Sequence, residues 1–316
     1  MRLEEIKIRC DEMLDELETV IVGKRPVLEN VVLCALCNGH LLFEDYPGLA
    51  KTMIASSFAR VSGCNFNRVQ FTPDLLPADI TGTYILDRRT SEFSLRKGPV
   101  FTNVLMADEI NRAPPKTQSA LLEAMQEKQV TLEGETHRIE EPFIVLATQN
   151  PIEYEGTYPL PEAQLDRFLM RTRVGYPTKE QEMDILKRRR RRMQEKVELK
   201  AVIDPHILLD MQKVVEGIHV DDSVDDYAVS IVTATRSNPN LELGASPRGS
   251  LALMRLGQAR AALNGRDYVL PDDVKSISVP ALSHRVILAP DPWMRGVLVE
   301  TVLEDVVSKV PVPKVD

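Results

Sequence analysis

The sequence has few cysteines and no long apolar run, and these absences exclude two broad classes of protein. Its 316 residues include four cysteines, too few for the disulfide framework that holds small secreted domains together. No run of about 18 apolar residues is present, so we expect no transmembrane helix. The first residues, Met1-Arg2-Leu3-Glu4-Glu5, are charged and lack the apolar core of a signal peptide. The sequence therefore predicts a cytoplasmic protein.

Positively charged residues are fewer than negatively charged ones. Lys and Arg number 39 against 47 Asp and Glu, and the formal net charge is -8, which argues against a general nucleic-acid-binding protein. The exception is a basic run at residues 187–192, from Lys187 to Arg192. Such a run can contact nucleic acid or serve as a targeting signal. Because it stands alone in an acidic chain, we interpret it as the solvated face of a linking helix.

Two of the cysteines, Cys34 and Cys37, form a C-x-x-C pair. No second Cys or His pair follows at the spacing of a zinc site. The pair lies in an apolar run, so we predict buried helix packing instead of metal binding.

Length and residue patterns predict two domains. A chain of 316 residues exceeds what one core usually holds. Apolar periodicity predicts helices over residues 3–19, 26–37, 52–61 and 116–127, and apolar runs predict buried strands over 40–43, 104–107 and 143–147. Alternating polarity predicts a hairpin over residues 129–139. From about residue 178 the pattern is mainly helical. The predicted fold is therefore α/β, with a parallel sheet in residues 1–177 and a linking helix and small all-helical domain in residues 178–316.

One segment has the features of a phosphate-binding loop. Asp45-Tyr46-Pro47-Gly48-Leu49-Ala50-Lys51-Thr52 follows a predicted strand and opens a predicted helix. Backbone N–H groups at a helix N-terminus favour an anion, the lysine adds a charge for the β- and γ-phosphates, and the threonine hydroxyl can bind Mg²⁺. The alternative interpretation is a Pro-Gly turn followed by a helix that happens to begin with Lys-Thr.

The loop departs from the general G-x-x-x-x-G-K-(S/T) pattern at two positions. Asp45 replaces the first glycine and Ala50 replaces the second. Alanine is acceptable if its φ is negative, so we expect a negative φ at Ala50. The carboxylate of Asp45 is unfavourable near phosphates unless it turns away.

Polar residues also follow the next two buried strands. Asp108 and Glu109 end the strand at 104–107, and Thr148-Gln149-Asn150 ends the strand at 143–147. Ligands bind at this edge of open α/β sheets. We expect Asp108 to hold Mg²⁺, Glu109 to activate or orient the attacking water, and Asn150 to sense the γ-phosphate. A solvated strand end is the plain alternative for each.

These residues give the sequence a resemblance to the MoxR branch of AAA+ ATPases that covers nearly the whole chain. The motifs that carry it are Pro47-Gly48-Leu49-Ala50-Lys51-Thr52, residues 71–82, residues 107–113, residues 123–127, residues 147–151, residues 160–168 and Ser246-Pro247-Arg248. The resemblance implies an αβα nucleotide-binding domain followed by a helical lid. It also implies an insert at about residues 81–98 and a hairpin at about residues 129–139, elements that often face the pore of a ring. Tyr84 and Phe93 in the insert suit contact with a client protein or packing within a strand, and we favour packing.

The same resemblance assigns further roles. Arg167 resembles the arginine finger that reaches the γ-phosphate of a neighbouring subunit, although a surface ion pair with Asp166 or Glu162 is the alternative. Arg248 resembles a second sensor on the lid, where Ser246 suits the N-cap and Pro247 the first helical position. Val22 and Gly23 match the segment that lies against adenine in similar proteins, or form a plain turn. The resemblance implies that the remaining residues that bind ATP or ADP are Tyr46, Pro47, Gly48, Leu49, Ala50, Lys51, Thr52 and Met53. It also implies that Thr52 and Asp108 bind the Mg²⁺ ion.

Three functions are consistent with these features. The first is a Mg²⁺-dependent ATPase that forms a ring, which the resemblance implies to be a hexamer. It remodels or matures a protein partner, such as one with a von Willebrand factor A domain. The second is a nucleotide-binding scaffold or switch with little turnover, suggested by Asp45 and the missing glycines. The third is a DNA-remodelling ATPase, suggested by residues 187–192, and the acidic net charge disfavours it.

Overall fold

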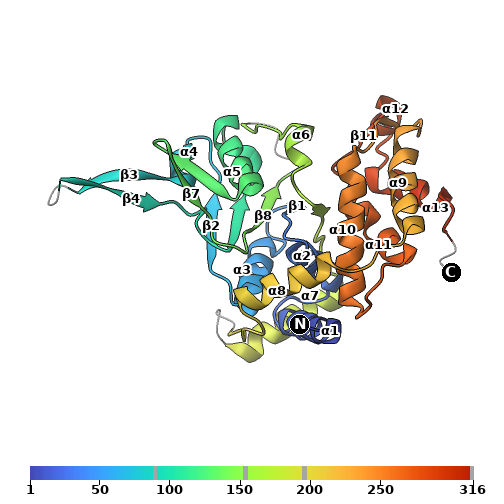
Figure 1. Ribbon diagram of the computed structural model, residues 1–316, viewed down its shortest axis with the longest axis horizontal. Helices are drawn as coiled ribbons and strands as arrows, with labels where there is room; N and C mark the ends of the chain where they lie inside the picture. The colour runs from blue at the N-terminus through green and yellow to red at the C-terminus, as the bar shows by residue number, and fades with distance from the viewer. Residues whose placement is uncertain (88–90, 152–155, 194–197, 314–316) are drawn as a thin grey trace.

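The structure is a computed structural model that describes residues 1–87, 91–151, 156–193 and 198–313. Its centre is a five-stranded sheet with the order β2-β5-β8-β1-β9 (Figure 1). All four neighbouring pairs are parallel. The strands are β1 (Leu41–Glu44), β2 (Phe66–Gln70), β5 (Val104–Asp108), β8 (Ile144–Gln149) and β9 (Met170–Thr172). The predicted α/β fold with a parallel sheet is confirmed.

Helices cover both faces of the sheet, and alternate strand residues belong to different cores. Leu41 and Phe43 join the cluster that contains the N-terminal helices and the lid, whereas Leu42 joins the cluster on the opposite face. This division follows from the two-residue period of a strand. The helices of the core are α1 (Leu3–Glu18), α2 (Arg25–Leu36), α3 (Lys51–Val61), α4 (Pro77–Thr81), α5 (Pro115–Glu127) and α6 (Glu162–Leu165), with a 3-10 turn at Ile110–Arg112. Cys34 and Cys37 are buried free thiols, as predicted.

Two antiparallel hairpins extend from the core. One consists of β3 (Gly82–Asp87) and β4 (Glu92–Lys97), and it projects from the body of the molecule (Figure 1). The other consists of β6 (Gln129–Leu132) and β7 (Glu135–Arg138), and the Tyr84 hydroxyl joins the two by donating to the Glu135 carboxylate at 2.5 Å. The preference for strand packing was wrong for Phe93, whose exposed fraction is 71%. An aromatic residue suits a strand conformation, but a two-stranded ribbon offers it no second layer. Residues 88–90 of the insert lie outside the described residues.

The C-terminal part is helical, as expected, and contains one strand pair that the sequence did not indicate. Its helices are α7 (Lys179–Arg192), α8 (Pro205–Glu216), α9 (Asp222–Arg236), α10 (Pro247–Leu263), α11 (Pro271–Leu282), α12 (Pro290–Met294) and α13 (Val299–Lys309). The short strands β10 (Leu241–Leu243) and β11 (Ile287–Leu288) pair antiparallel. Strands of two or three residues are too short to leave a periodic signal. In the part of the chain that the structure describes, no helix is both long and apolar enough to cross a membrane.

The basic run lies in the last turns of α7. Arg188 forms an ion pair with Asp184 at 2.8 Å and donates to the backbone carbonyl of Glu18 at 2.7 Å, which ties α7 to α1. Arg190 and Arg191 are exposed. The run therefore combines an anchor to α1 with the solvated face that we expected.

Candidate functional site

The phosphate loop connects the C-terminal end of β1 to the N-terminus of α3. Gly48 and Ala50 both have positive φ, of 82° and 59°. The expectation of a negative φ at Ala50 was therefore wrong. Ala50 is the residue immediately before α3, and a left-handed conformation there turns the chain into the helix. Alanine accepts this conformation at a cost of about 1–2 kcal/mol, which a glycine would not incur.

Asp45 stabilises the loop and faces away from the phosphate site. Its side chain is 6% exposed, and its two carboxylate oxygens accept hydrogen bonds from the backbone N–H groups of Tyr46 at 2.8 Å and Gly175 at 2.6 Å. The carboxylate thus joins the start of the loop to the segment that follows β9. Its negative charge is stabilised by backbone donors on the side away from the phosphate site.

Lys51 and Thr52 begin α3 and line a cavity of about 470 Å³. The Lys51 ammonium group donates to the carbonyl oxygens of Asp45 at 2.5 Å and Tyr46 at 2.8 Å. Burial lowers the pKa of Lys51, and the nearby carboxylates of Asp45, Asp108 and Glu109 oppose this shift. A phosphate group in this cavity would add an anion to the lysine's surroundings and so favour its charged form.

The two acidic residues at the end of β5 are held by Thr148 of the neighbouring strand β8. The Thr148 hydroxyl donates to the Asp108 carboxylate at 2.6 Å and accepts from the Glu109 backbone N–H at 2.7 Å. Glu109 has a φ of 56°, an uncommon conformation that needs support from its surroundings. One buried hydroxyl therefore fixes both acids.

Further side chains orient the two carboxylates. Arg68 donates to the second Asp108 oxygen at 2.6 Å. The Glu109 carboxylate accepts from the Gln70 amide at 2.7 Å and forms an ion pair with Arg112 at 3.2 Å. Sequence reasoning missed Arg68 and Gln70 because it did not identify β2 as a strand. The segment Phe66–Gln70 has neither the apolar run nor the strict alternation that mark a strand, so it left only a weak signal.

The structure brings most of the predicted phosphate-site residues into this one cavity. The cavity is lined by Pro47, Gly48, Leu49, Ala50, Lys51, Thr52, Met53, Arg68, Gln70, Asp108, Glu109, Thr148 and Asn150. A hard cation such as Mg²⁺ is usually held by one or two protein oxygens together with phosphates and water. The Thr52 hydroxyl and the Asp108 carboxylate share the cavity and provide such a donor set. No group of three or more His, Cys, Asp or Glu side chains is placed to hold a metal alone, as far as the described chain extends.

The predicted adenine segment lies beside the connector to α7. The Gly23 carbonyl accepts from the Gln181 amide at 3.3 Å, and Lys24 donates to the Tyr176 carbonyl at 2.9 Å. The ring of Tyr176 lies 6.1 Å from the ring of Tyr46, measured between centroids. Val22 is half-buried in the same turn. The segment is therefore linked to the start of the phosphate loop through Tyr176.

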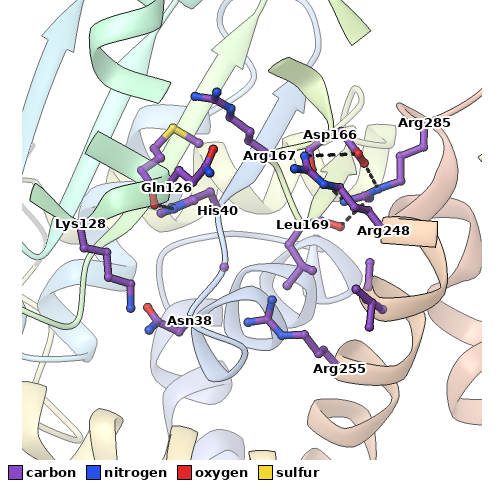
Figure 2. A pocket seen from close by; sticks show the side chains of 14 residues that line it. Asn38, His40, Gln126, Lys128, Asp166, Arg167, Leu169, Arg248, Arg255 and Arg285 are labelled. Carbon is purple, nitrogen blue, oxygen red and sulfur yellow. Dashed lines mark hydrogen bonds and ion pairs between the residues drawn. The ribbon is translucent and has the colours of Figure 1, made fainter. Parts of the chain in front are cut away.

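Arg167 and Arg248 do not line the phosphate cavity. Both line a second cavity of about 420 Å³ between the core and α10 (Figure 2). Arg248 lies 3.6 Å from the Asp166 carboxylate. Ser246 caps α10 by accepting from the Arg248 N–H at 3.2 Å, with Pro247 at the first helical position, as predicted. Figure 2 shows the Arg167 side chain pointing away from Asp166. Within the described residues, Asp166 pairs with Arg248 and Arg285, and Arg167 forms no ion pair with Asp166 or Glu162.

Comparisons with known proteins agree with this arrangement. Residues 40–170 match the ATPase family associated with various cellular activities (AAA), and residues 233–306 match the AAA lid domain. The chain is 43% identical to Chaperone MoxR1 of Mycobacterium tuberculosis, over 95% of this chain and 81% of that protein. It is 47% identical to the YeaC protein of Bacillus subtilis, over 95% and 93% of the two chains. It also matches a crystal structure of an ATPase candidate from Cytophaga hutchinsonii with a TM-score of 0.91 and 39% identity, covering 99% of this chain and 97% of that one.

The chain belongs to the MoxR family of AAA+ ATPases. Every residue of the phosphate cavity lies within the matched AAA region of this MoxR-family protein. Arg248 lies within its matched lid region. The resemblance inferred from the motifs is thus confirmed at the level of the family.

Proposed function

We propose that this protein hydrolyses ATP to ADP and phosphate with Mg²⁺ and uses the energy to remodel partner proteins as a ring. In this proposal Lys51 and the loop N–H groups bind the phosphates, and Thr52 and Asp108 hold the cation. Bound Mg²⁺ would neutralise developing charge on the phosphate oxygens. Glu109 orients and deprotonates the attacking water, and Asn150 holds that water beside the γ-phosphate.

The separation of the two cavities carries the proposal that the active unit is an oligomer. The phosphate loop follows the C-terminal end of β1, whereas Asn38, Gly39 and His40 of the second cavity precede its N-terminal end. The four residues of β1 alone span about 13 Å. An arginine that lines the second cavity is therefore poorly placed to reach the nucleotide of its own subunit.

A neighbouring subunit removes this difficulty. One face of each subunit would supply the phosphate cavity, and the other face would supply Arg167 and Arg248. Such a head-to-tail interface closes into a ring when its rotation is suitable. We propose a hexamer on the basis of family resemblance, with Arg167 and Arg248 both acting on the neighbour's nucleotide.

A protein client completes the proposed function. One relative carries the name chaperone, and we propose a protein client here, with a von Willebrand factor A domain protein as a candidate partner. The projecting hairpin of β3 and β4 presents Ile85, Leu86 and Phe93 as exposed apolar side chains, which suits contact with a protein client. We further propose the division into domains at residues 177 and 178 and a cytoplasmic location.

The structure weakens the case for a scaffold with little turnover. That hypothesis depended on Asp45 and on the missing glycines of the loop. Asp45 faces away from the cavity, and Ala50 adopts the left-handed conformation that glycine commonly provides. Both departures are therefore compatible with phosphate binding.

Steady-state phosphate release from ATP tests the proposal. We expect wild-type turnover per subunit to rise with protein concentration across the range of assembly. Lys51→Ala should lose ATP binding, and Glu109→Gln should bind ATP while turnover falls by about a hundredfold or more. Wild-type protein that assembles and binds ATP but releases no phosphate at any concentration would favour the scaffold and contradict the proposal.

A further inference from the structure

A short segment of the lid holds the backbone on either side of Arg167. Ser283, His284 and Arg285 follow α11, and we call them the lid hook. Arg171 donates to the hydroxyl of Ser283 at 3.1 Å and to its carbonyl at 2.8 Å. The Nε2 atom of His284 lies 2.9 Å from the Phe168 carbonyl oxygen. The hook thus docks on the chain that runs from the arginine finger into β9.

Arg285 makes the most extensive contacts of the hook. Its side chain is only 4% exposed. The guanidinium donates to the carbonyl oxygens of Phe168 at 2.8 Å, Leu169 at 3.1 Å and Asp166 at 3.4 Å, and also to the carbonyl of Ala281. It further pairs with the Asp166 carboxylate at 2.8 Å. Carbonyl groups on both sides of Arg167 are therefore fixed by one planar group from the lid.

Asp166 connects the same network to Arg248. One carboxylate oxygen accepts from Arg285, and the other lies 3.6 Å from Arg248 and 3.3 Å from the Ser246 hydroxyl. Figure 2 shows Asp166 between the two lid arginines, with Arg167 projecting to the other side. Because the Arg167 guanidinium takes no part in this network, its direction depends on the backbone that Arg285 holds.

We propose that Arg285 is a positioning residue that sets Arg167 for use by the neighbouring subunit's nucleotide. Asp166 links this function to Arg248, so the finger and the lid of one subunit move together. A guanidinium suits the task because its five donors in a fixed plane can hold several carbonyls at once, whereas a lysine offers a single point of charge. This inference rests on the proposed ATPase function and on the action of Arg167 across the subunit interface.

Mixing inactive variants provides a test that separates positioning from general structural damage. Arg285→Gln should keep its own phosphate cavity and its KM for ATP, while kcat falls about tenfold or more. Mixed with an equal amount of Lys51→Ala, which keeps an intact finger, it should regain about a quarter of wild-type turnover. Random assembly places a competent cavity beside a competent finger at about a quarter of interfaces. When Arg285→Gln is mixed with Arg167→Ala, turnover should not recover, because both variants lack a competent finger.

The control is the mixture of Arg167→Ala with Lys51→Ala. If turnover recovers in this control but not in the mixture of Arg285→Gln with Lys51→Ala, Arg285 serves the fold or the site of its own subunit. The inference would then be wrong. Wild-type kcat in Arg285→Gln would also overturn it. If Arg167→Ala is inactive alone and Lys51→Ala does not restore its turnover, or if Arg167→Ala is fully active alone, the shared site of the proposed function is refuted instead. If Arg285→Gln does not fold by circular dichroism, Arg285→Lys carries the same mixing test, with a smaller loss of kcat expected.

Discussion

Replacing Thr148 by valine should disable the catalytic acids while keeping the shape of the buried side chain. The change removes a hydrogen bond to the Asp108 carboxylate and one from the Glu109 N–H, at 2.6 and 2.7 Å. A bond to a charged group contributes about 1.5–3 kcal/mol and a neutral one about 0.5–1.5 kcal/mol, so the pair contributes about 2–4.5 kcal/mol. Thr148 is 1% exposed, and water cannot readily replace its hydroxyl.

Loss of these two hydrogen bonds must lower either kcat or the free energy of unfolding. If Glu109 leaves its left-handed conformation to find another partner, the free energy of unfolding is unchanged and kcat falls by about 30- to 1600-fold, at about 1.4 kcal/mol per tenfold. If Glu109 stays, the free energy of unfolding falls by a similar energy instead. Phosphate release at saturating ATP and urea unfolding measure the two quantities. The Mg²⁺ concentration for half-maximal turnover should also rise, because Asp108 loses its orientation.

Thr148→Ser is the matched control, because it keeps the hydroxyl and removes only a methyl group. We expect its kcat to stay within about threefold of wild type. A Thr148→Val protein with nearly wild-type kcat and an unchanged urea midpoint would refute the reasoning, since neither readout would contain the energy of the two bonds.

Three further predictions concern stability. Ala50→Gly should raise the free energy of unfolding by about 1 kcal/mol, because glycine accepts the φ of 59° without strain; a lower urea midpoint would contradict this. Asp45→Gly, which restores the general loop pattern, should instead destabilise the protein by about 2–3 kcal/mol, because the N–H groups of Tyr46 and Gly175 lose their acceptor; unchanged thermal unfolding would count against this role. Burial lowers the pKa of His40 to about 4, below its unfolded value of about 6.5. The unfolded chain therefore binds a proton that the folded chain excludes, and the contribution of neutral His40, complete above pH 6.5, should fall by about 2 kcal/mol by pH 5. Urea unfolding at pH 7 and pH 5 should show a smaller pH effect in His40→Gln than in wild type, and equal effects would exclude this assignment.

Much of the fold was predictable because its signals are local. The runs that form β5 and β8 are almost wholly apolar, as strands covered on both faces must be. The edge strand β2 has neither an apolar run nor strict alternation, because Asn67 and Arg68 are both polar, and it was not identified. Its residues Arg68 and Gln70 were therefore missed, although they contact Asp108 and Glu109.

The sequence also failed where a residue's own preference opposes its surroundings. Alanine prefers a negative φ, yet the turn into α3 imposes a positive one on Ala50. Phe93 is typical of a packed strand, yet its ribbon projects from the molecule and leaves it exposed. In both cases the geometry of the neighbouring elements prevailed over intrinsic propensity.

By itself, the sequence determined the fold class, the family and the chemical groups of the phosphate site, because each depends on residues that are adjacent in the chain. Only the tertiary structure decided which of these residues share a cavity. It separated Arg167 and Arg248 from the phosphate loop and placed Arg285 against Asp166 across 119 positions of sequence. A contact of that kind leaves no local pattern, because it exists only when the packing of the lid on the core brings the two segments together.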